Sequence, residues 1–227
     1  MKNFAIMRVQ KLRQGSRGGG TLGTALKHLE HHEKSAEISH PENTCNNYYK
    51  ARTYKEASDY IRKNINEHNK HHERAFRKDA AVACEFIFSY SPTIGQDMHF
   101  AREFELEALT FLKEHYPSAR CLAIARHCDE SSFHWHFVMT CFEKDTHTLS
   151  IRNMLGGPAE LRTAQDVFAD KVEHLGLARG ISKDITKSTH KTKRQHNHDI
   201  LTQRQKEDAL IEKRAQEARR AIFGDER

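Results

Sequence analysis

Apolar residues along this chain recur with two spacings, one typical of β-strands and one typical of α-helices. Four segments have apolar side chains that alternate with polar ones or form short runs rich in β-branched and aromatic residues. These predicted strands are residues 3–12, 80–90, 121–127 and 133–142. Three other segments have apolar residues every three or four positions, and a fourth, at 28–33, has histidines at that spacing. These predicted helices are residues 28–33, 53–69, 97–115 and 158–175.

The predicted helices carry start and stop residues at suitable positions. Thr53 and Glu56 fit a capping box, Asp97 fits a helix N-cap, and Pro158 fits a first turn. Gly176 fits a helix stop. The residues expected to face the core are Ala57, Tyr60, Ile61 and Ile65 in the first of these helices, Phe100, Phe104, Leu109, Phe111 and Leu112 in the second, and Leu161, Ala164, Phe168, Val172 and Leu175 in the third.

In chain order the predicted elements are β, α, α, β, α, β, β and α. Helices that pack on one face of an antiparallel sheet leave the other face for a ligand. The sequence therefore predicts an α+β domain with an antiparallel β-sheet, helices packed on one face and the active site on the other.

The two strands at 121–127 and 133–142 bring three histidines together. Successive side chains of a strand point to opposite faces, so His134 and His136 share a face. If the strands form an antiparallel hairpin, His127 lies opposite that pair. A lone histidine in a strand is usually structural, but this arrangement favours a metal site with open coordination positions. Asp129 and Glu130, in the turn, are candidates to orient an imidazole, to add a fourth ligand or to act as a base.

Composition adds a preference for polyanionic partners. The chain has 227 residues, with 37 Lys and Arg against 31 Asp and Glu, a net charge of +6 and a pI near 9.0. This balance is equally typical of an ordinary soluble protein, so it has weight only beside a site. Five cysteines without a Cys-x-x-Cys pair, no signal peptide and no apolar run of about 18 residues predict a cytoplasmic protein with reduced thiols.

Three basic segments are candidate contacts for phosphate groups of a polyanion. One is the glycine-rich loop after the first strand, one precedes the second strand, and one follows the last helix, where no apolar pattern remains. Their candidate residues are Arg13, Arg17, Arg74, Arg77, Lys78, Lys187, Lys191, Lys193 and Arg194. A flexible connector and ordinary surface charge are the alternative interpretations. Residues 202–222, rich in Ala, Glu, Lys and Arg, predict an exposed helix.

Two groups of residues have no function that spacing alone assigns. His28, His31 and His32 would lie on one edge of a helix, as a second metal patch or, in the favoured interpretation, as a solvated polar face. Tyr48 and Tyr49 are possible nucleophiles.

Several segments together resemble a known family. The segment HCDESSFHWH, residues 127–136, resembles the third motif of the HUH relaxases of the plasmid mobilisation and recombination (Mob/Pre, MobV-like) family, in which a His-x-Asp-Glu turn is followed by His-x-His. LGTALKH, residues 22–28, resembles the first motif, and residues 74–79 and 176–180 also resemble family segments. Phe133 stands where the family usually has proline, which weakens the turn argument without changing a ligand.

The resemblance implies a relaxase that nicks one strand of a plasmid transfer origin and keeps the 5′ phosphate end covalently attached. It implies a histidine nucleophile in the first motif, His28, whereas related relaxases use tyrosine, which keeps Tyr48 and Tyr49 as alternatives. Glu130 is the preferred carboxylate to hold a proton of His28. His127, His134 and His136 would hold the metal. By intrinsic affinity imidazoles prefer Zn²⁺ or Cu²⁺, whereas the resemblance implies Mn²⁺ or Mg²⁺.

The implied partners are origin-of-transfer DNA, with a single-stranded nick region beside a duplex or hairpin, and conjugation coupling machinery. The implied organisation is a relaxase domain at residues 1–200 and a charged helix at 201–227. Two alternatives stay open: a non-catalytic origin-binding protein with a structural metal, and a metal-dependent hydrolase of small phosphates, which would not need the basic tail.

Overall fold

A seven-stranded β-sheet forms the centre of the described fold. The structure is a computed structural model, and it describes residues 2–15, 20–30, 38, 40–95, 97–130, 132–181, 185, 202, 205–215 and 217. The strands are β1 (Asn3–Arg13), β2 (Tyr48–Ala51), β3 (Ala81–Tyr90), β4 (Ala119–His127), β5 (His134–Glu143), β6 (Thr148–Leu149) and β7 (Leu177–Arg179). Their order is β2-β4-β5-β3-β1-β7, with β6 paired to β5. Among the described strands, β1 and β7 pair in parallel, and all other neighbouring strands pair antiparallel.

Three of the described helices of this region, α2, α3 and α5, begin within a residue of the predicted starts, whereas α1 begins at Leu22, six residues before the helix predicted at 28–33, and α4 was not predicted. They are α1 (Leu22–Glu30), α2 (Tyr54–His71), α3 (Met98–His115), α4 (Ile151–Leu155) and α5 (Pro158–Lys171), with 3₁₀ turns at Pro41–Asn46, Pro92–Ile94 and Glu173–Leu175. Thr53 and Glu56 form the predicted capping box of α2. Asp97 accepts hydrogen bonds from two backbone N–H groups at the start of α3. The caps satisfy backbone donors that have no partner within the helix.

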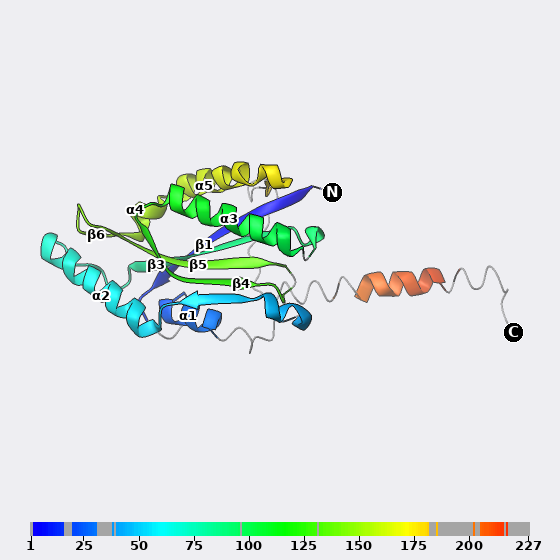
Figure 1. Cartoon of the computed structure of the whole chain (residues 1–227), viewed down its shortest axis with the longest axis horizontal. Coiled ribbons are helices and arrows are strands. Elements are labelled where there is room, and N and C mark those ends of the chain that lie inside the picture. Colours follow the sequence, from blue (N-terminus) through cyan, green and yellow to red (C-terminus); the bar gives the residue numbers. More distant parts are fainter. Residues whose placement is uncertain are drawn as a thin grey trace. The chain divides into compact units, whose positions relative to one another are not determined.

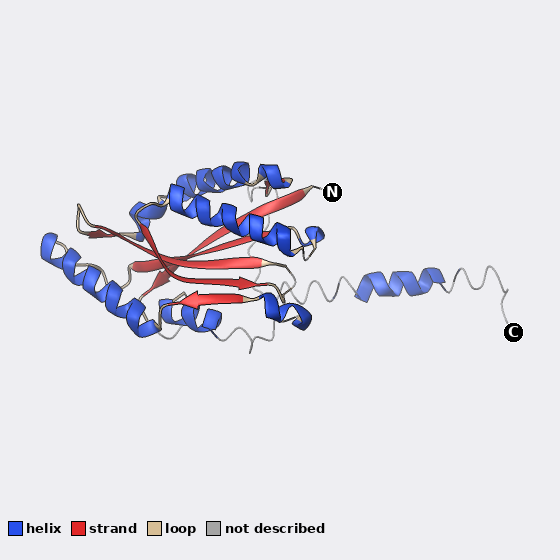
Figure 2. Cartoon of the chain, viewed as in Figure 1, coloured by secondary structure: helices blue, strands red, loops and turns tan. Residues whose placement is uncertain are grey.

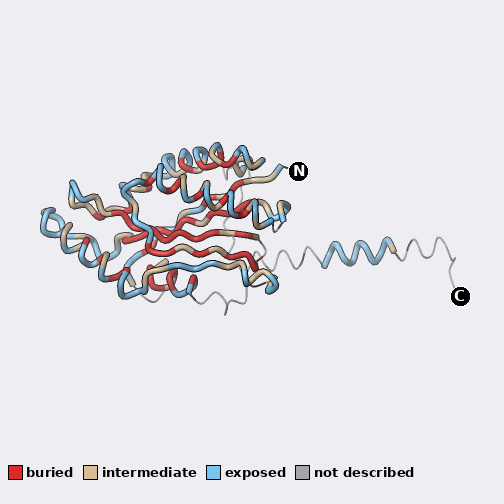
Figure 3. Tube along the Cα trace, in the orientation of Figure 1, coloured by how far each residue is buried: buried red, intermediate tan, exposed pale blue. Residues whose placement is uncertain are grey.

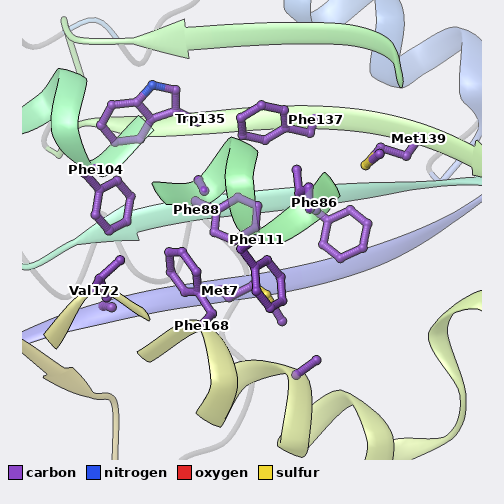
Figure 4. Close-up of a cluster of buried hydrophobic side chains, with 14 of the residues drawn as sticks. Met7, Phe86, Phe88, Phe104, Phe111, Trp135, Phe137, Met139, Phe168 and Val172 are labelled. Atoms are coloured by element: carbon purple, nitrogen blue, oxygen red, sulfur yellow. The ribbon is translucent and has the colours of Figure 1, made fainter. Parts of the chain in front are cut away.

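One face of the sheet is covered by α3, α4 and α5 over a core of aromatic side chains (Figures 1 and 4). Alternate residues of the central strands point into this core, because side chains of a strand alternate between faces. The aromatic members with no more than 1% exposure are Phe86, Phe88, Tyr90, Phe104, Phe111, Trp135, Phe137 and Phe168. Figure 3 accordingly shows the central strands buried and the helices buried only along their inner sides.

The opposite face is covered over part of its area by α1 and α2. Leu22, Leu26 and Leu29 of α1 and Ile61 of α2 pack there with Val138 of β5. Figure 2 shows the resulting mixture of strands and helices, which confirms the predicted α+β class. His127, His134 and His136 lie on this second face, which we call the histidine face. A small apolar core covers part of it, and the rest carries the site described below.

The structure adds short elements that the apolar pattern does not reveal: β2, β6, β7 and α4. The prediction that Leu109 faces the core is wrong, because this residue of α3 is 42% exposed. The alanines Ala101 and Ala108 are buried on that helix. Small side chains bring the helix close to the sheet, so the inner stripe of α3 is narrower than its large apolar residues indicate.

The chain divides into two units, Met1–Gly180 and Ile181–Arg227. In the second unit, residues 205–215 are helical and largely exposed, in agreement with the helix predicted there. Residue 200, the predicted end of the relaxase domain, lies outside the described residues, so that boundary stays a prediction. Among the described helices, each is too short or too polar to cross a lipid bilayer.

Candidate functional site

The predicted histidine hairpin forms, and its register brings the three imidazoles together. His127 of β4 pairs directly with His134 of β5, and His136 pairs with Ala125 one step along the same face. The ring centroids lie 5.0 Å apart for His127 and His134, and 4.9 Å apart for each of the other two pairs. Because all three residues are on paired strands, the sheet itself fixes their spacing.

Hydrogen bonds orient two of these rings. His134 Nδ1–H donates to the carbonyl oxygen of Ser132 at 2.9 Å. His136 Nδ1–H donates to Oε1 of Glu85 at 2.8 Å. A hydrogen bond at Nδ1 fixes the tautomer whose other nitrogen, Nε2, carries a lone pair suitable for a metal.

Glu85, on β3, is a site residue that the sequence analysis missed. It is 6% exposed, and burial raises the pKa of its carboxyl, while His28 and His134 act in the opposite direction. A buried carboxylate needs hydrogen bonds or opposite charge, and His136 supplies the hydrogen bond. The one signal in the sequence was a single acid within the apolar run AVACEFIFSY.

His28 is brought over the three histidines by the way the chain leaves β1. The N–H of Arg13 donates to the carbonyl of Gly20 at 2.9 Å, and Gly20 has a φ of +71°, which reverses the chain. Helix α1 then packs its leucines on the sheet, as described above. The ring of His28 lies 6.0 Å from that of His127 and 5.9 Å from that of His136.

The two acids of the hairpin turn lie in different surroundings. Glu130 is buried beside the histidines, with one oxygen 3.9 Å from His127 Nδ1 and the other 4.0 Å from His134 Nε2. The carboxylate of Asp129 accepts hydrogen bonds from Thr44 Oγ1 at 2.9 Å and from Asn47 Nδ2 at 2.8 Å. Asp129 therefore holds the segment before β2 against the turn, and Glu130 faces the histidines.

The donor atoms fit a divalent cation. His127 Nδ1 lies 3.2 Å from His134 Nε2. Two ligands at right angles, each about 2.1 Å from an ion, lie about 3 Å apart. The ligand atoms of His28, His127 and His136 all lie within 4.8 Å of one another, and so do those of His127, Glu130 and His134. His127 belongs to both groups, so a cation bound here would take it as a ligand together with His28 and His136, or together with Glu130 and His134.

Other possible nucleophiles near the site are less suitable chemically. Burial raises the pKa of the Tyr49 hydroxyl, and the charge of Glu30 raises it further. Burial raises the pKa of the Cys128 thiol to about 11. A protonated hydroxyl or thiol is a weaker nucleophile than its deprotonated form, so either group would need a base to remove its proton.

The predicted DNA contacts are only partly within the described residues. Arg13, Arg74, Arg77 and Lys78 are exposed. The guanidinium of Arg77 forms two hydrogen bonds with the carboxylate of Asp79, at 3.0 and 2.6 Å. The remaining candidates lie outside the described residues: Arg17, Lys187, Lys191, Lys193 and Arg194. His31 and His32 of the histidine-rich segment also lie outside them.

Solved structures with a similar fold include a MobM relaxase domain bound to 22 nucleotides of plasmid pMV158 oriT DNA and to Mn. It has a TM-score of 0.67 and 26% sequence identity, covering 86% of this chain and 99% of that one. A second complex of the MobM domain, with 26 nucleotides of oriT DNA, has a TM-score of 0.58 and 25% identity, covering 85% of this chain and 99% of that one.

Curated relatives and a family model are similar to this chain in sequence. A 65 kDa protein of Zymomonas mobilis is 24% identical over 202 residues, which are 88% of this chain and 33% of that protein. Plasmid recombination enzyme type 3 of Staphylococcus aureus is 24% identical over 192 residues, which are 83% of this chain and 46% of that protein. The chain thus spans a third to just under half of these relatives. The model of the Mob_Pre plasmid recombination enzymes matches residues 1–222, and the chain belongs to that family.

Proposed function

We propose that this chain is a metal-dependent relaxase that nicks one strand of origin-of-transfer DNA at a defined site. In the proposed reaction it becomes covalently joined to the 5′ phosphate and later reseals the strand. The observation that carries the proposal is the position of His28, whose ring lies 6.0 and 5.9 Å from two of three clustered histidines. The substrate would be plasmid DNA in the cytoplasm.

The metal would be held by His127, His134 and His136, whose ring centroids lie 4.9 to 5.0 Å apart. The MobM domains of similar fold contain Mn, so Mn²⁺ is the first ion to test and Mg²⁺ the second. When bound, the ion supplies positive charge that orients the scissile phosphate and stabilises charge developing on it. Glu85 orients His136, because a buried carboxylate that accepts from Nδ1–H fixes the ring and raises its basicity.

His28 supplies the nucleophile. A lone pair of one imidazole nitrogen attacks phosphorus, a nitrogen–phosphorus bond forms, and the bond from phosphorus to the 3′ oxygen breaks. The proton on the other ring nitrogen passes to a carboxylate, for which we propose Glu130. The 3′ oxygen leaves as a hydroxyl by taking up a proton through solvent, which balances the proton released by His28. The new linkage joins the protein to the 5′ phosphate, and reversal of the same step reseals the strand.

Affinity for DNA would come from phosphate contacts, which position a nucleic acid without reading its sequence. The proposed contacts are Arg13, Arg17, Arg74, Arg77, Lys78, Lys187, Lys191, Lys193 and Arg194. The guanidinium of Arg77 forms an ion pair with Asp79. Arg77 must break this ion pair before it can bind a phosphate.

The test uses single-stranded oligonucleotides with a randomised central sequence, incubated with the protein and Mn²⁺ and then denatured. Label at the 3′ end should migrate with the protein, because the 3′ fragment carries the attached 5′ phosphate. Label at the 5′ end should stay with free DNA. A protein that binds DNA but never yields an adduct would favour the non-catalytic origin-binding alternative.

Single substitutions then identify the nucleophile. His28→Ala should remove the adduct, and Tyr48→Phe and Tyr49→Phe should retain it. Loss of the adduct in either tyrosine variant, with its survival in His28→Ala, would overturn the histidine assignment. A supporting experiment replaces Glu130 with Gln, which keeps the shape but cannot take up the proton. This variant should slow adduct formation by about a hundredfold or more.

A further inference from the structure

One row of paired residues runs across five strands on the histidine face. Arg8 of β1 pairs with Ile87 of β3, and Ile87 pairs with His136 of β5. His136 pairs with Ala125 of β4, and Ala125 pairs with Tyr49 of β2. Directly paired residues point to the same face of a sheet, so these five side chains form a line with His136 at its centre.

The two ends of this row, Arg8 and Tyr49, lie at equal distances from His136. Each is two strands away, and neighbouring strands are about 4.8 Å apart, so each lies about 10 Å from the proposed cleavage site. This distance is within reach of the nucleotides that flank a scissile phosphate. Because the strands are rigid, the spacing does not depend on a flexible loop.

Tyr49 is suited to contact a base. It is 40% exposed on the edge strand β2, and no described aromatic ring stacks on it. Edge strands leave one side of the sheet open to a ligand. Every nucleobase has a flat π-face, so an exposed tyrosine binds unpaired bases by stacking with little regard to sequence.

Arg8 is suited to contact a phosphate. It is exposed, although it lies in the middle of β1 and shares a face with Ile6 and Leu12. Among the described residues Arg8 has no acidic partner, and its side chain is exposed to solvent. A guanidinium binds phosphate oxygens with two parallel hydrogen bonds.

We propose that Arg8 and Tyr49, the exposed ends of this row, mark the track on which single-stranded DNA passes His136. The row between them is not open along its whole length, because Ala125 is fully buried in the core on which α1 packs. Arg8 binds a backbone phosphate on one side of His136, and Tyr49 stacks on an unpaired base on the other side. This inference rests on the proposed function, which identifies the ligand as DNA. It gives Tyr49 a role in binding instead of the nucleophilic role considered from the sequence.

The chain provides matched controls for both ends of the track. Tyr48 neighbours Tyr49 on β2 and is 42% exposed, but it pairs with Arg126 and so points to the opposite face. Lys11 is an exposed cation on β1 that pairs with Cys84, again on the opposite face from Arg8. Substitutions at these controls remove the same kind of group without touching the proposed track.

The experiment measures binding of a fluorescein-labelled oligothymidylate by anisotropy, with EDTA present so that no cleavage occurs, over a series of salt concentrations. Tyr49→Ala should weaken binding by about tenfold without changing the salt dependence, and Tyr49→Phe should restore affinity because it keeps the ring. Arg8→Gln should weaken binding and reduce the slope of log affinity against log salt by about 0.7, the value for one phosphate contact on a single strand. Tyr48→Ala and Lys11→Gln should bind like the unmodified protein.

Two results would overturn the track. One is unchanged affinity in both Tyr49→Ala and Arg8→Gln, and the other is an equal loss in the two controls. Either result is separate from failure of the proposed function, which would appear as absence of the adduct in the unmodified protein. Loss of the adduct in Tyr49→Phe with DNA binding retained would also overturn the inference, because it would make Tyr49 the nucleophile.

Discussion

The two faces of the central sheet are made from alternate residues of the same strands, and they differ in chemistry where β5 crosses the centre of the sheet. On β5, Trp135 and Phe137 enter an aromatic core with no more than 1% exposure, while His134 and His136 point to the other face. The aromatic face is covered by three helices. The histidine face is covered only in part, by α1 and α2, and collects Glu85, Glu130 and four imidazoles.

This difference shows how a single strand separates stability from chemistry. Burial of large aromatic side chains provides most of the free energy that a strand contributes to folding. Ionisable groups contribute little and can be costly when buried. Because Trp135 packs β5 into the aromatic core, the neighbouring histidines need not contribute to the stability of the strand. Substitutions on the two faces should therefore fail in different ways.

The largest expected effect is on the histidine face. His134→Ala removes one proposed metal ligand, and it should reduce Mn²⁺-dependent adduct formation by more than about a thousandfold. Duplex DNA binding and the denaturation midpoint should change little, because the side chain lies at the edge of the core. Nicking at the original rate would remove the metal role from this histidine.

The next effect is on the aromatic face. Trp135→Ala should lower the free energy of unfolding by about 3–5 kcal/mol, because it leaves a cavity in a packed core. Urea denaturation followed by circular dichroism measures this loss. Leu109→Ala on α3 is the control, since Leu109 is exposed, and it should change stability by no more than about 0.5 kcal/mol. A small loss for Trp135→Ala would contradict the division between the faces.

A smaller effect distinguishes acids on the two faces. Glu85→Gln keeps a hydrogen-bond acceptor for His136 but removes the charge, and it should weaken Mn²⁺ binding by about 10–100-fold in titration calorimetry. Glu105→Gln is the matched control, because Glu105 pairs with Arg126 on the aromatic face at 2.9 Å. Equal Mn²⁺ affinities in the two variants would mean that Glu85 does not tune the site.

The smallest effect concerns a histidine on the aromatic face. His115 of α3 stacks on Phe111, with ring centroids 5.1 Å apart, and burial lowers its pKa. A lowered pKa means that the unfolded chain takes up the proton first as pH falls, so stability decreases below about pH 6.5. His115→Gln should reduce the loss of stability between about pH 7 and pH 5 by no more than about 0.5 kcal/mol. A larger loss of unfolding free energy at low pH in His115→Gln than in the unmodified protein would contradict the lowered pKa of His115.

Sequence reasoning predicts those features that depend on local periodicity. Strand alternation alone places His134 and His136 on one face, and a hairpin places His127 opposite them, as the register confirms. The caps of α2 and α3 are likewise local and are confirmed.

The missed features depend on contacts between distant segments. Strand β2 has the polar sequence YYKA and exists because it pairs with β4, which no local pattern reveals. Glu85 gains its role from a hydrogen bond to a residue 51 positions away. Leu109 fits the helical period, but the alanines of α3 decide which side approaches the sheet.

The hydrogen bonds of Asp129 join two parts of the molecule with different tasks. Its carboxylate binds Thr44 and Asn47, just before the edge strand that carries Tyr49, and its neighbour in sequence is Glu130. These bonds tie the turn beside the proposed cation ligands to the segment that leads into the outermost strand. If the proposed function holds, the protein meets an incoming nucleic acid with its edge strand already positioned relative to the proposed metal site.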